Sequence, residues 1–357
     1  MTTNIKGNKG EWSEMYVLLR LLGEGKIYSA DENVHKIEEI YFPILKIIRE
    51  ETSTKKCEYE IRNKVQIYLN DTLVKEIPTS DFNQEADYLY KQIVVGKNRT
   101  FPIEKTEQFM HEIYCNRLAA PSTDKTDITM QIHDIQTGYT PVCGFSIKSE
   151  IGSAPTLINA SGATNFIFEV TGLSDKQIDS INAIEARTKI KDRMDRIFSE
   201  AQEVKFLRVS SETFDRHLML IDSRLTELVA YSLLYHYRDS IINCSEVIDK
   251  LEKDNPMGYP TSGFYKYKFK KFLCSAALGM TPAKMWDGID EANGGYIIVT
   301  ASGDVLAYHI YNRACFEQYL LNQTRFERGS TARHNFASLY KANNKVYLNL
   351  NLQIRFK

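Results

Sequence analysis

The sequence predicts an α/β protein in which helices flank a central mixed sheet. Apolar residues make up 43% of the 357 residues and charged residues 25%, a balance typical of a soluble globular protein. A chain of this length can bury a sizeable core in two domains or in one elaborated domain. Segments with the period of two that marks strands alternate with segments of helical period, and no internal repeat or low-complexity linker interrupts them.

The first part of the chain begins with a strongly apolar helix, for which Gly23 in the following "GEG" provides a C-terminal stop signal. Strands and two further helices follow, and one strand turns back at "NDT". In chain order the segments are a helix over 11–22, strands over 39–48, 63–71 and 73–77, and helices over 81–95 and 103–118.

The remainder of the chain continues the mixture. Strand candidates precede a charged helical stretch and one long helix, and the basic aromatic segment "GFYKYKFKKFL" leads to the last strands. In chain order the segments are strands over 127–134, 142–149 and 165–171, a helical stretch over 174–200, the short run "VKFLRV" over 204–209, a helix over 211–239, the basic aromatic segment over 263–273, and strands within 294–311 and 345–356.

Charge is unevenly distributed along the chain. The formal net charge of -1 hides a basic final part, because residues 261–357 carry 13 Lys and Arg against 6 Asp and Glu. The first 260 residues have a net charge of -8. A basic region on an acidic chain favours a surface that faces a polyanion, although many solvated faces have a similar composition. The stretch "DNPMGYPTSG" indicates a boundary between a region over 1–256 and a basic region over 257–357.

The six cysteines are scattered, without a C-x-x-C pair or a neighbouring His cluster, so neither a zinc site nor a disulfide framework is indicated. We expect reduced and mostly buried thiols. The N-terminal residues lack the apolar stretch of a signal peptide, and charges interrupt the most apolar helical segment. These features predict a cytoplasmic protein.

Two of the strand candidates form a predicted hairpin with one polar face. In "DITMQIH" the side chains of Asp127, Thr129, Gln131 and His133 share one face, and the apolar residues between them share the other. The run from 144 alternates in the same way, with Ser146 and Lys148 on its polar side and Phe145 and Ile147 on its apolar side.

The register of the hairpin decides which polar residues meet. A two-residue turn at Thr137 and Gly138 pairs Thr129 with Ser146 and Asp127 with Lys148. A carboxylate and an amine then meet at the open end of the hairpin. On spacing alone the pair is interpreted as a cross-strand ion pair worth about 0.2–1 kcal/mol, so a functional role needs further support.

The wider sequence resembles the HpaII-type restriction endonucleases of the PD-(D/E)xK nuclease superfamily. The resemblance is carried, in order, by "NKGEWSEMYVLLRLL", by "TDITMQIHD...GFSIKSEIG...TLINASGATNF" and by "YLNLNLQIRF", and it covers essentially the whole chain. The superfamily places an Asp at the start of one strand and a (D/E)-x-K on the next, matched here by Asp127 and by Lys148 in "SIK". The resemblance implies a PD-(D/E)xK restriction-endonuclease-like core with a C-terminal DNA-recognition part.

One position departs from this pattern, because Ser146 stands where the second acid is expected. Either metal binds less tightly, or a carboxylate comes from elsewhere. Nucleases of this fold can take an acid from the helix ahead of the core sheet, and Glu14 in the first predicted helix is our candidate. Alternatively, Glu11 and Glu14 lie in the first turn because carboxylates there interact favourably with the helix dipole. The reserve candidates are Glu107, Glu112 and Glu150.

The chemistry of phosphodiester hydrolysis explains these residue types. The reaction needs an activated water, neutralisation of charge on the phosphate and help for the departing alkoxide, and Mg²⁺ can supply the last two. Asp127 is the natural ligand because hard Mg²⁺ prefers carboxylate oxygens. The resemblance implies the backbone carbonyl of Ile147 as another ligand. Lys148 is expected to hold or deprotonate the attacking water and to contact the scissile phosphate.

The resemblance also implies cleavage of unmethylated duplex DNA at 5′-CCGG, with a cognate DNA methyltransferase as the functional partner. A two-fold target favours a homodimer, and guanine is read by bidentate Arg or Lys. For each residue of the basic region an ordinary surface or phosphate contact remains an alternative. The candidates for DNA contacts are Arg325, Arg328, Arg333, His334, Gln353 and Arg355, and the candidates for tracking phosphates are Lys266, Lys268, Lys270 and Lys271.

The competing class is a DNA- or RNA-binding protein without catalysis, which the basic final region alone supports. "RHNF" at 333–336 lacks the remaining His and the spacing of an HNH nuclease, and "GYIIV" at 295–299 is typical of a buried strand rather than of a GIY-YIG site. A phosphate-binding G-x-x-x-x-G-K-[ST] loop is absent from the sequence, which argues against nucleotide hydrolysis.

Overall fold

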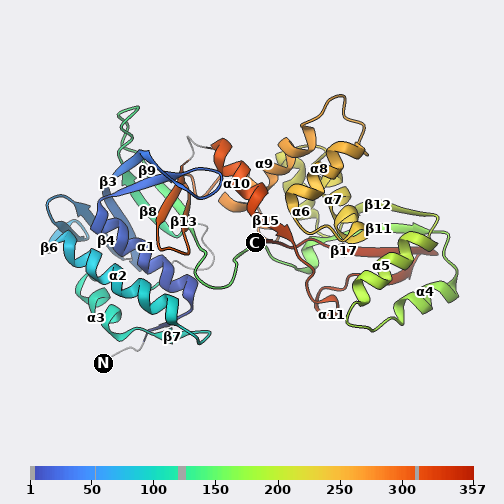
Figure 1. The fold of residues 1–357 in the computed structure, drawn as a ribbon, viewed down its shortest axis with the longest axis horizontal. Helices are drawn as coiled ribbons and strands as arrows, with labels where there is room; N and C mark the ends of the chain where they lie inside the picture. Colours follow the sequence, from blue (N-terminus) through green and yellow to red (C-terminus); the bar gives the residue numbers. More distant parts are fainter. Residues whose placement is uncertain (1–4, 53, 120–125, 310–312) are drawn as a thin grey trace. The chain divides into compact units, whose positions relative to one another are not determined.

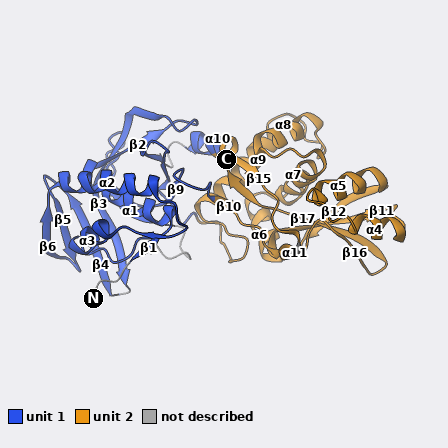
Figure 2. Ribbon diagram, turned by 60° about the horizontal axis from the view of Figure 1, so that its bottom comes forward, with its two compact units in different colours: residues 1–155, 290–319 blue, residues 156–289, 320–357 orange. Residues whose placement is uncertain are grey.

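The structure is a computed structural model that describes residues 5–52, 54–119, 126–309 and 313–357. The chain forms two compact units, which Figure 2 colours separately. Unit 1 contains residues 1–155 and 290–319, and unit 2 contains residues 156–289 and 320–357. The chain therefore passes between the two units three times.

Unit 1 is built on a mixed sheet (Figure 1) whose strand order is β2-β14-β13-β9-β8-β3-β4-β5-β6. β13 runs parallel to β9, whereas β8 and β9 are antiparallel. The long strand β3 also pairs with β2, so the pairings of the described residues close a ring through β2, β14, β13, β9, β8 and β3. The predicted mixed α/β architecture is confirmed.

The elements of unit 1 begin and end at the following residues: β1 (Lys6–Gly7), α1 (Lys9–Glu24), β2 (Lys26–Ala30), β3 (Lys36–Thr52), β4 (Lys55–Ile61), β5 (Val65–Leu69), β6 (Thr72–Ile77), α2 (Thr79–Val95), β7 (Phe101–Pro102), α3 (Glu104–Glu112), β8 (Ile128–Ile132), β9 (Val142–Ser149), β13 (Gly295–Val299), β14 (Val305–His309) and α10 (Arg313–Gln323). The last helix crosses the division between the units, which falls after residue 319. Residues 310–311, the end of a predicted strand, lie outside the described residues.

Helix α1 supplies the centre of the unit 1 core and packs with the apolar row of the hairpin. Its stop residue is Gly25 rather than the predicted Gly23. Gly25 takes a φ of 68° at the C-cap, a left-handed conformation in which glycine avoids a steric cost. Gly23 lies inside the helix, where Asn83 packs so closely that a Cβ would collide with it.

The predicted hairpin forms β8 and β9, but in another register. Ile128 lies opposite Phe145 and Thr129 opposite Gly144, so the pairing is shifted by two residues from the predicted one. Because side chains alternate with a period of two, this shift leaves every residue on its predicted face. The predicted apolar row is buried as expected and comprises Ile128, Met130, Ile132, Phe145 and Ile147.

The loop of the hairpin explains the shift. Asp134 and Tyr139 close a loop over residues 135–138, which is longer than the predicted two-residue turn. The carboxylate of Asp134 accepts bonds from the backbone of Gln136 (2.9 Å) and from the hydroxyl of Thr137 (2.6 Å). This side-chain capping stabilises the longer loop. Gly138 has the positive φ, 75°, that the prediction required.

Unit 2 contains two smaller sheets, β12-β11-β17-β16 and β10-β18-β15, together with most of the helices that follow residue 156. Its elements are β10 (Thr156–Ile158), a 3₁₀ turn (Gly162–Thr164), β11 (Asn165–Thr171), α4 (Asp175–Asn182), α5 (Lys189–Glu200), β12 (Glu203–Val209), α6 (Glu212–Ile221), α7 (Leu225–Asp239), α8 (Cys244–Asp254), α9 (Phe264–Leu278), β15 (Thr324–Phe326), α11 (Thr331–His334), β16 (Leu339–Ala342), β17 (Lys345–Asn351) and β18 (Ile354–Phe356).

Two helical predictions change in unit 2. The single helix expected over 211–239 is two helices, α6 and α7, because Asp222 adopts an extended backbone and its carboxylate accepts a bond from the backbone N–H of Arg224 (2.9 Å). The basic aromatic segment over 263–273, to which the sequence alone assigned no secondary structure, forms the first part of helix α9, with Tyr265 and Phe269 buried.

The units divide the chain differently from the predicted boundary. Residue 256 falls inside unit 2, between α8 and α9, and β13 and β14 of the predicted basic region fold with unit 1. The reason is the parallel pairing of β9 with β13, which requires a crossover connection. Here the crossover carries most of unit 2 as an insertion.

Two predictions on the composition concern the whole chain. Among the described residues, every helix falls short of the length and apolar character that crossing a membrane demands. Five of the six cysteine thiols are buried, as expected, and Cys315 is half-buried.

Candidate active site

The polar face of the hairpin carries a connected group formed by Asp127, Ser146 and Lys148. The backbone N–H of Asp127 donates to the carbonyl of Phe145 (2.9 Å), which extends the ladder one residue beyond β8. In this register Asp127 faces Ser146 rather than Lys148, which corrects the predicted pairing. The hydroxyl of Ser146 donates to Oδ2 of Asp127 (3.1 Å), and the same oxygen accepts the backbone N–H of Ile147 (2.6 Å).

The amine of Lys148 completes this group. Its Nζ donates to Oγ of Ser146 (3.3 Å) and to the carbonyl oxygen of Ile147 (3.0 Å). The hydroxyl of Ser146 therefore links the carboxylate of Asp127 to the amine of Lys148, so the two groups are connected without a direct ion pair. Ser146 is buried, whereas Asp127 and Lys148 are half-buried and accessible to a ligand.

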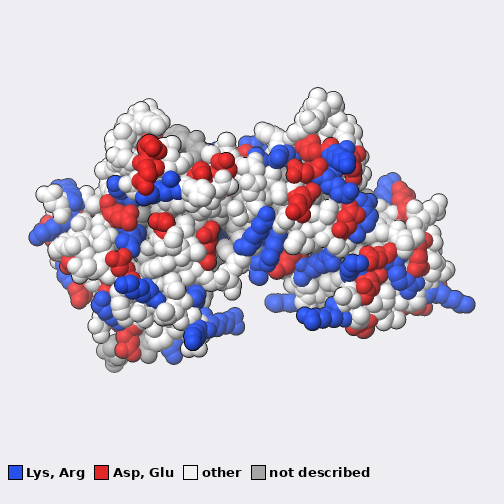
Figure 3. Space-filling model, in the orientation of Figure 1, with Lys and Arg blue, Asp and Glu red and all other residues white. Residues whose placement is uncertain are grey.

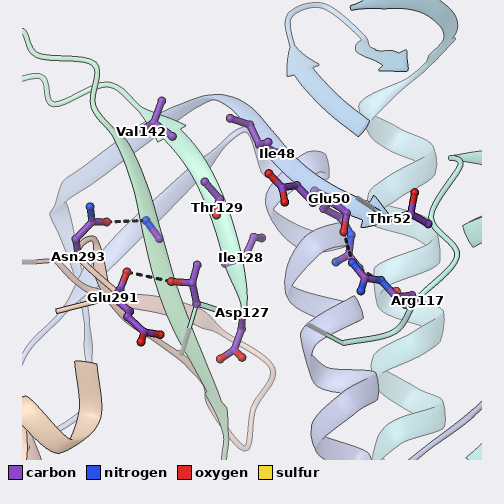
Figure 4. A pocket seen from close by; sticks show the side chains of 13 residues that line it. Ile48, Glu50, Thr52, Arg117, Asp127, Ile128, Thr129, Val142, Glu291 and Asn293 are labelled. Carbon is purple, nitrogen blue, oxygen red and sulfur yellow. Dashed lines mark hydrogen bonds between the residues drawn. The ribbon is translucent and has the colours of Figure 1, made fainter. Parts of the chain in front are cut away.

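A cavity of about 740 Å³ opens beside Asp127 (Figure 4). Thr129 and Gly144 of the hairpin line it, as does Glu50 near the end of β3. Glu50 was absent from the predicted site residues, because only the pairing of β3 with β8 brings this strand beside Asp127. Glu291, also absent from the prediction, lines the cavity from the loop before β13.

Hydrogen bonds fix the walls of this cavity. The side chain of Asn293 accepts the backbone N–H of Gly144 (2.8 Å), and the hydroxyl of Thr126 donates to the carbonyl of Glu291 (3.0 Å), as the dashed lines in Figure 4 show. On another wall Arg117 donates to the carbonyl of Glu50. Thr126, the residue before Asp127, is thus hydrogen-bonded to the loop that leads into β13.

The structure separates the candidates for the second acid. Glu14 is half-buried on α1, next to Ser13, whose hydroxyl donates to Oγ of Ser149 (2.9 Å) just beyond Lys148. Glu11 instead caps α1 through a bond from the backbone of Asn8 (2.7 Å), as the alternative interpretation of this turn expects.

The three reserve candidates have partners away from Asp127. Glu107 is buried and accepts the backbone N–H of Ile5 (3.1 Å), and Glu112 pairs with Lys75 (3.3 Å). Glu150 accepts the backbone N–H of Ala301 (3.2 Å). Each of these three carboxylates therefore has a structural contact of its own.

The oxygen atoms beside the cavity fit a hard divalent cation. Oδ1 of Asp127 has no hydrogen-bond partner among the described residues, and the carbonyl of Ile147 lies beside the same group. In the part of the chain that the structure describes, no three His, Cys, Asp or Glu side chains gather into a metal-binding group. Mg²⁺ keeps several waters and often takes only one or two protein carboxylates, so this oxygen donor set fits a hard cation such as Mg²⁺ better than a soft metal.

Comparison with known proteins assigns the chain to a family. The sequence model of the HpaII restriction endonuclease family matches residues 8–356. The chain belongs to the HpaII restriction endonuclease family. It is 39% identical over 364 aligned residues to the type II restriction enzyme HpaII of Haemophilus parainfluenzae, and the alignment covers 100% of both chains. No solved structure matches the sequence.

Membership of the HpaII family decides between the two classes that the sequence predicted. The chain is a type II restriction endonuclease, and therefore a hydrolase, rather than a binding protein without catalysis. The resemblance found on the sequence segments around Asp127 and Lys148 is confirmed along the whole chain.

The predicted DNA contacts of this HpaII-family chain lie in unit 2. Arg325 of β15 pairs directly across the sheet with Arg355 of β18. Both arginines contact Glu327, at 3.7 Å from Arg325 and 3.2 Å from Arg355, and Arg355 also donates to the hydroxyl of Thr156. Glu327 thus compensates part of the charge of this pair.

Arg328 has a different environment. Its guanidinium lies 5.2 Å from the ring centroid of Tyr237 and donates to the carbonyl of His236 (3.3 Å). Burial lowers the pKa of Arg328 below its ordinary value, and no described carboxylate lies within ion-pair distance of it. Arg328 therefore has no carboxylate within ion-pair distance among the described residues, and Asp195 acts on its charge only from farther away.

The remaining candidates surround this segment. Gly329 packs against the side chains of Gln353 and His334, and Arg333 is exposed on the short helix α11. Oε1 of Gln353 is buried without a hydrogen-bond partner among the described residues. The structure thus brings together, on β15, β18 and the residues after β15, side chains that the sequence placed 30 residues apart.

The lysines of α9 are less uniform than the sequence suggested. Lys268 forms an ion pair with Asp222 and is mostly buried, which removes it from the surface that was expected to track phosphates. Lys266 lies 3.7 Å from Asp249, and Lys271 lies over the ring of Tyr267. In Figure 3 basic side chains gather around β15 and the C-terminus. On the rest of the visible face, basic and acidic side chains are mixed.

Proposed function

We propose that this enzyme hydrolyses phosphodiester bonds of unmethylated duplex DNA at the palindrome 5′-CCGG, with Mg²⁺ as its cofactor. The observation that carries the proposal is the hydroxyl of Ser146, which links the carboxylate of Asp127 to the amine of Lys148 at the edge of an open cavity. The relative from Haemophilus parainfluenzae is named a type II restriction enzyme, which supports a site-specific double-strand cut.

The proposed roles follow from the contacts. Asp127 would hold Mg²⁺ through its free Oδ1, with the carbonyl of Ile147 and the carboxylate of Glu14 as further ligands. A bound Mg²⁺ supplies charge neutralisation at the phosphate and lowers the pKa of a coordinated water. Lys148 holds the attacking water and contacts the scissile phosphate, and Ser146 keeps its amine beside Asp127. Together these residues form the catalytic part of a PD-(D/E)xK core.

We propose unit 2 as the DNA-recognition part. Arg328 and the neighbouring candidates, Arg333, His334 and Gln353, are proposed to face the base edges, and Arg325 and Arg355 to contact phosphates because Glu327 already compensates part of their charge. The two-fold symmetry of the target favours a homodimer. The enzyme would act in the cytoplasm, with a methyltransferase of the same specificity protecting host DNA.

The decisive experiment is cleavage of a plasmid that contains 5′-CCGG sites, followed by sequencing of the ends. We expect cleavage with Mg²⁺ and none after EDTA. Lys148→Ala and Asp127→Asn should each abolish cleavage, a loss of more than about 1,000-fold, because each removes one side of the bridged group. Binding to a specific oligonucleotide without metal should remain largely intact.

A matched control is Lys46→Ala. Lys46 lies on β3 of the same sheet and bonds to Glu58 (2.8 Å) rather than to the Asp127 group. It should leave the cleavage rate within about twofold of wild type, as is usual for a substitution away from the site. Wild-type cleavage by either Lys148→Ala or Asp127→Asn would end the assignment of the active site, and cleavage that persists in EDTA would end the proposed metal requirement.

A further inference from the structure

The side chain beneath Lys148 is the ring of Tyr296. Tyr296 belongs to β13, which runs parallel to β9, and it lies directly beside Ser146 in the register of the two strands. Nζ of Lys148 lies 5.7 Å from the centroid of the Tyr296 ring. An ammonium group within about 6 Å of an aromatic centroid is attracted by the negative face of the ring.

The position of this ring is fixed by its surroundings. Tyr296 is fully buried. Its ring packs against Phe316 of α10 with centroids 5.2 Å apart, and Tyr308 of β14 packs against the same Phe316 at 5.6 Å. The three rings form an aromatic layer (Tyr296, Tyr308, Phe316) on the face of the sheet that carries Ser146. Among the rings of the described residues, that of Tyr296 alone lies within cation–π distance of the lysine amine.

The hydroxyl of Tyr296 remains a neutral phenol. Burial raises the pKa of Tyr296 well above its ordinary value, and the negative charge of Asp127 acts in the same direction. The ring therefore does not become an anion that competes with Asp127 for the amine. Its contribution to Lys148 comes from the aromatic face and from its shape.

A lysine side chain needs such support because its four-carbon stem carries about 2 kcal/mol of rotamer entropy. Three contacts restrict the amine of Lys148 here, namely the carbonyl of Ile147, the hydroxyl of Ser146 and the ring of Tyr296. The first two lie on β9 itself. Tyr296 is the contact that the neighbouring strand β13 provides.

We propose that Tyr296 is a positioning residue for DNA cleavage, whose aromatic face holds the amine of Lys148 in its working place beside Asp127. The inference rests on the proposed function, since it assigns Lys148 to the reaction. It goes beyond the nuclease motif, because it draws a residue from "GYIIV", a segment that the sequence identified only as a buried strand.

The test compares variants that keep or remove the ring. Tyr296→Phe retains the aromatic face and should cleave within about twofold of wild type. Tyr296→Leu and Tyr296→Met remove the ring and should lower kcat by about 3- to 30-fold, the range that corresponds to a cation–π contact. Binding of a specific oligonucleotide without metal should not change, because Tyr296 is buried away from the DNA. Methionine fills irregular space well, so Tyr296→Met provides the measurement if Tyr296→Leu does not fold.

The matched control is Tyr308→Leu, which removes a ring from the same aromatic layer without removing a contact to Lys148. It should lose stability but keep its kcat within about twofold in the folded fraction, as measured beside thermal unfolding. Equal losses in Tyr308→Leu and Tyr296→Leu would overturn the proposal in favour of general packing. An equal loss in Tyr296→Phe, or wild-type rates in Tyr296→Met, would also overturn it.

The role of Tyr296 and the proposed function are tested by different measurements, so one can fail without the other. If wild-type protein cuts DNA and Lys148→Ala does not, the proposed function stands whatever the Tyr296 variants do. If wild-type protein does not cut, the proposed function itself fails.

Discussion

A serine at the position of an acid changes what the active-site residues can do. A second carboxylate beside Asp127 would repel it and attract the amine of Lys148 into an ion pair. The hydroxyl of Ser146 instead donates to Asp127 and accepts from Lys148, which satisfies both groups without adding charge. The proposed site is therefore one negative charge short of the PD-(D/E)xK pattern that the sequence resembles, and a second acid would have to come from another element.

The requirement for a second acid can be tested by substituting Glu14. Glu14→Gln keeps the size of the side chain but removes its charge, so we expect cleavage to fall by at least about 100-fold while the fold is retained. The measurement is the cleavage rate over a series of Mg²⁺ concentrations, with circular dichroism as a check on folding. Glu11→Gln is the matched control, because Glu11 lies in the same helix turn and caps it. Near-normal rates for Glu14→Gln would shift the role to Glu50 or Glu291, carboxylates that line the same cavity as Asp127.

Arg328 separates base reading from phosphate contact. An arginine without an acidic partner is available for a guanine, and losing such a contact costs about 1–3 kcal/mol of discrimination. Arg328→Ala should therefore relax the preference for one base pair in a series of oligonucleotides with single substitutions in 5′-CCGG. Arg325→Ala is the comparison, since Glu327 already pairs with Arg325, and it should weaken all targets alike. Uniform weakening by Arg328→Ala would identify a phosphate contact instead.

At the scale of the element, the hairpin shows what a sequence pattern can and cannot predict. Alternation assigned Asp127, Ser146 and Lys148 to one face and the buried row of Ile128 and Phe145 to the other, and the structure agrees. The register was wrong by two residues, because the pattern is the same for every even shift. The length of the turn decides between such registers.

Asp134 is the residue that sets this turn. Its carboxylate is buried and accepts bonds from the backbone of Gln136 and from the hydroxyl of Thr137. Asp134→Ala should lower the free energy of unfolding by about 1–3 kcal/mol, because it removes the charged acceptor of the hydrogen bonds from Gln136 and Thr137. Urea denaturation measures the loss. Gln136→Ala, in the exposed part of the same loop, should stay within about 0.5 kcal/mol of wild type. Equal stability of both variants would contradict the role of Asp134.

Other site residues had no local signal in the sequence. Glu50 ends an apolar strand, and Tyr296 lies within five consecutive buried residues of β13. Both reach the site through pairings between strands that are far apart in the chain. Helix α1 and the two faces of the hairpin follow from periods within one segment, whereas these contacts depend on which strands become neighbours. A single sequence does not specify those neighbours.

At the scale of the whole molecule, the core of unit 1 is built from two chain segments, one before and one after the insertion over 156–289. β13 and β14 return after unit 2 and complete the sheet beside β9 and β2. A fragment over 1–256, the predicted nuclease core, lacks both strands. It also ends inside unit 2, between α8 and α9. We expect this fragment to show no cooperative unfolding transition and no plasmid cleavage. A fragment that unfolds cooperatively and nicks DNA would restore the predicted boundary.

The late return of β13 also has a consequence during translation. A ribosome adds residues from the N-terminus, so Asp127 and Lys148 leave it well before Tyr296 is synthesised. Until residue 299 has emerged, β9 lacks its parallel neighbour, and the ring beneath Lys148 is not in place. A nascent chain with an exposed hairpin is therefore not yet an assembled nuclease. The order of synthesis thus separates the emergence of the proposed catalytic residues from the completion of an endonuclease able to cut DNA.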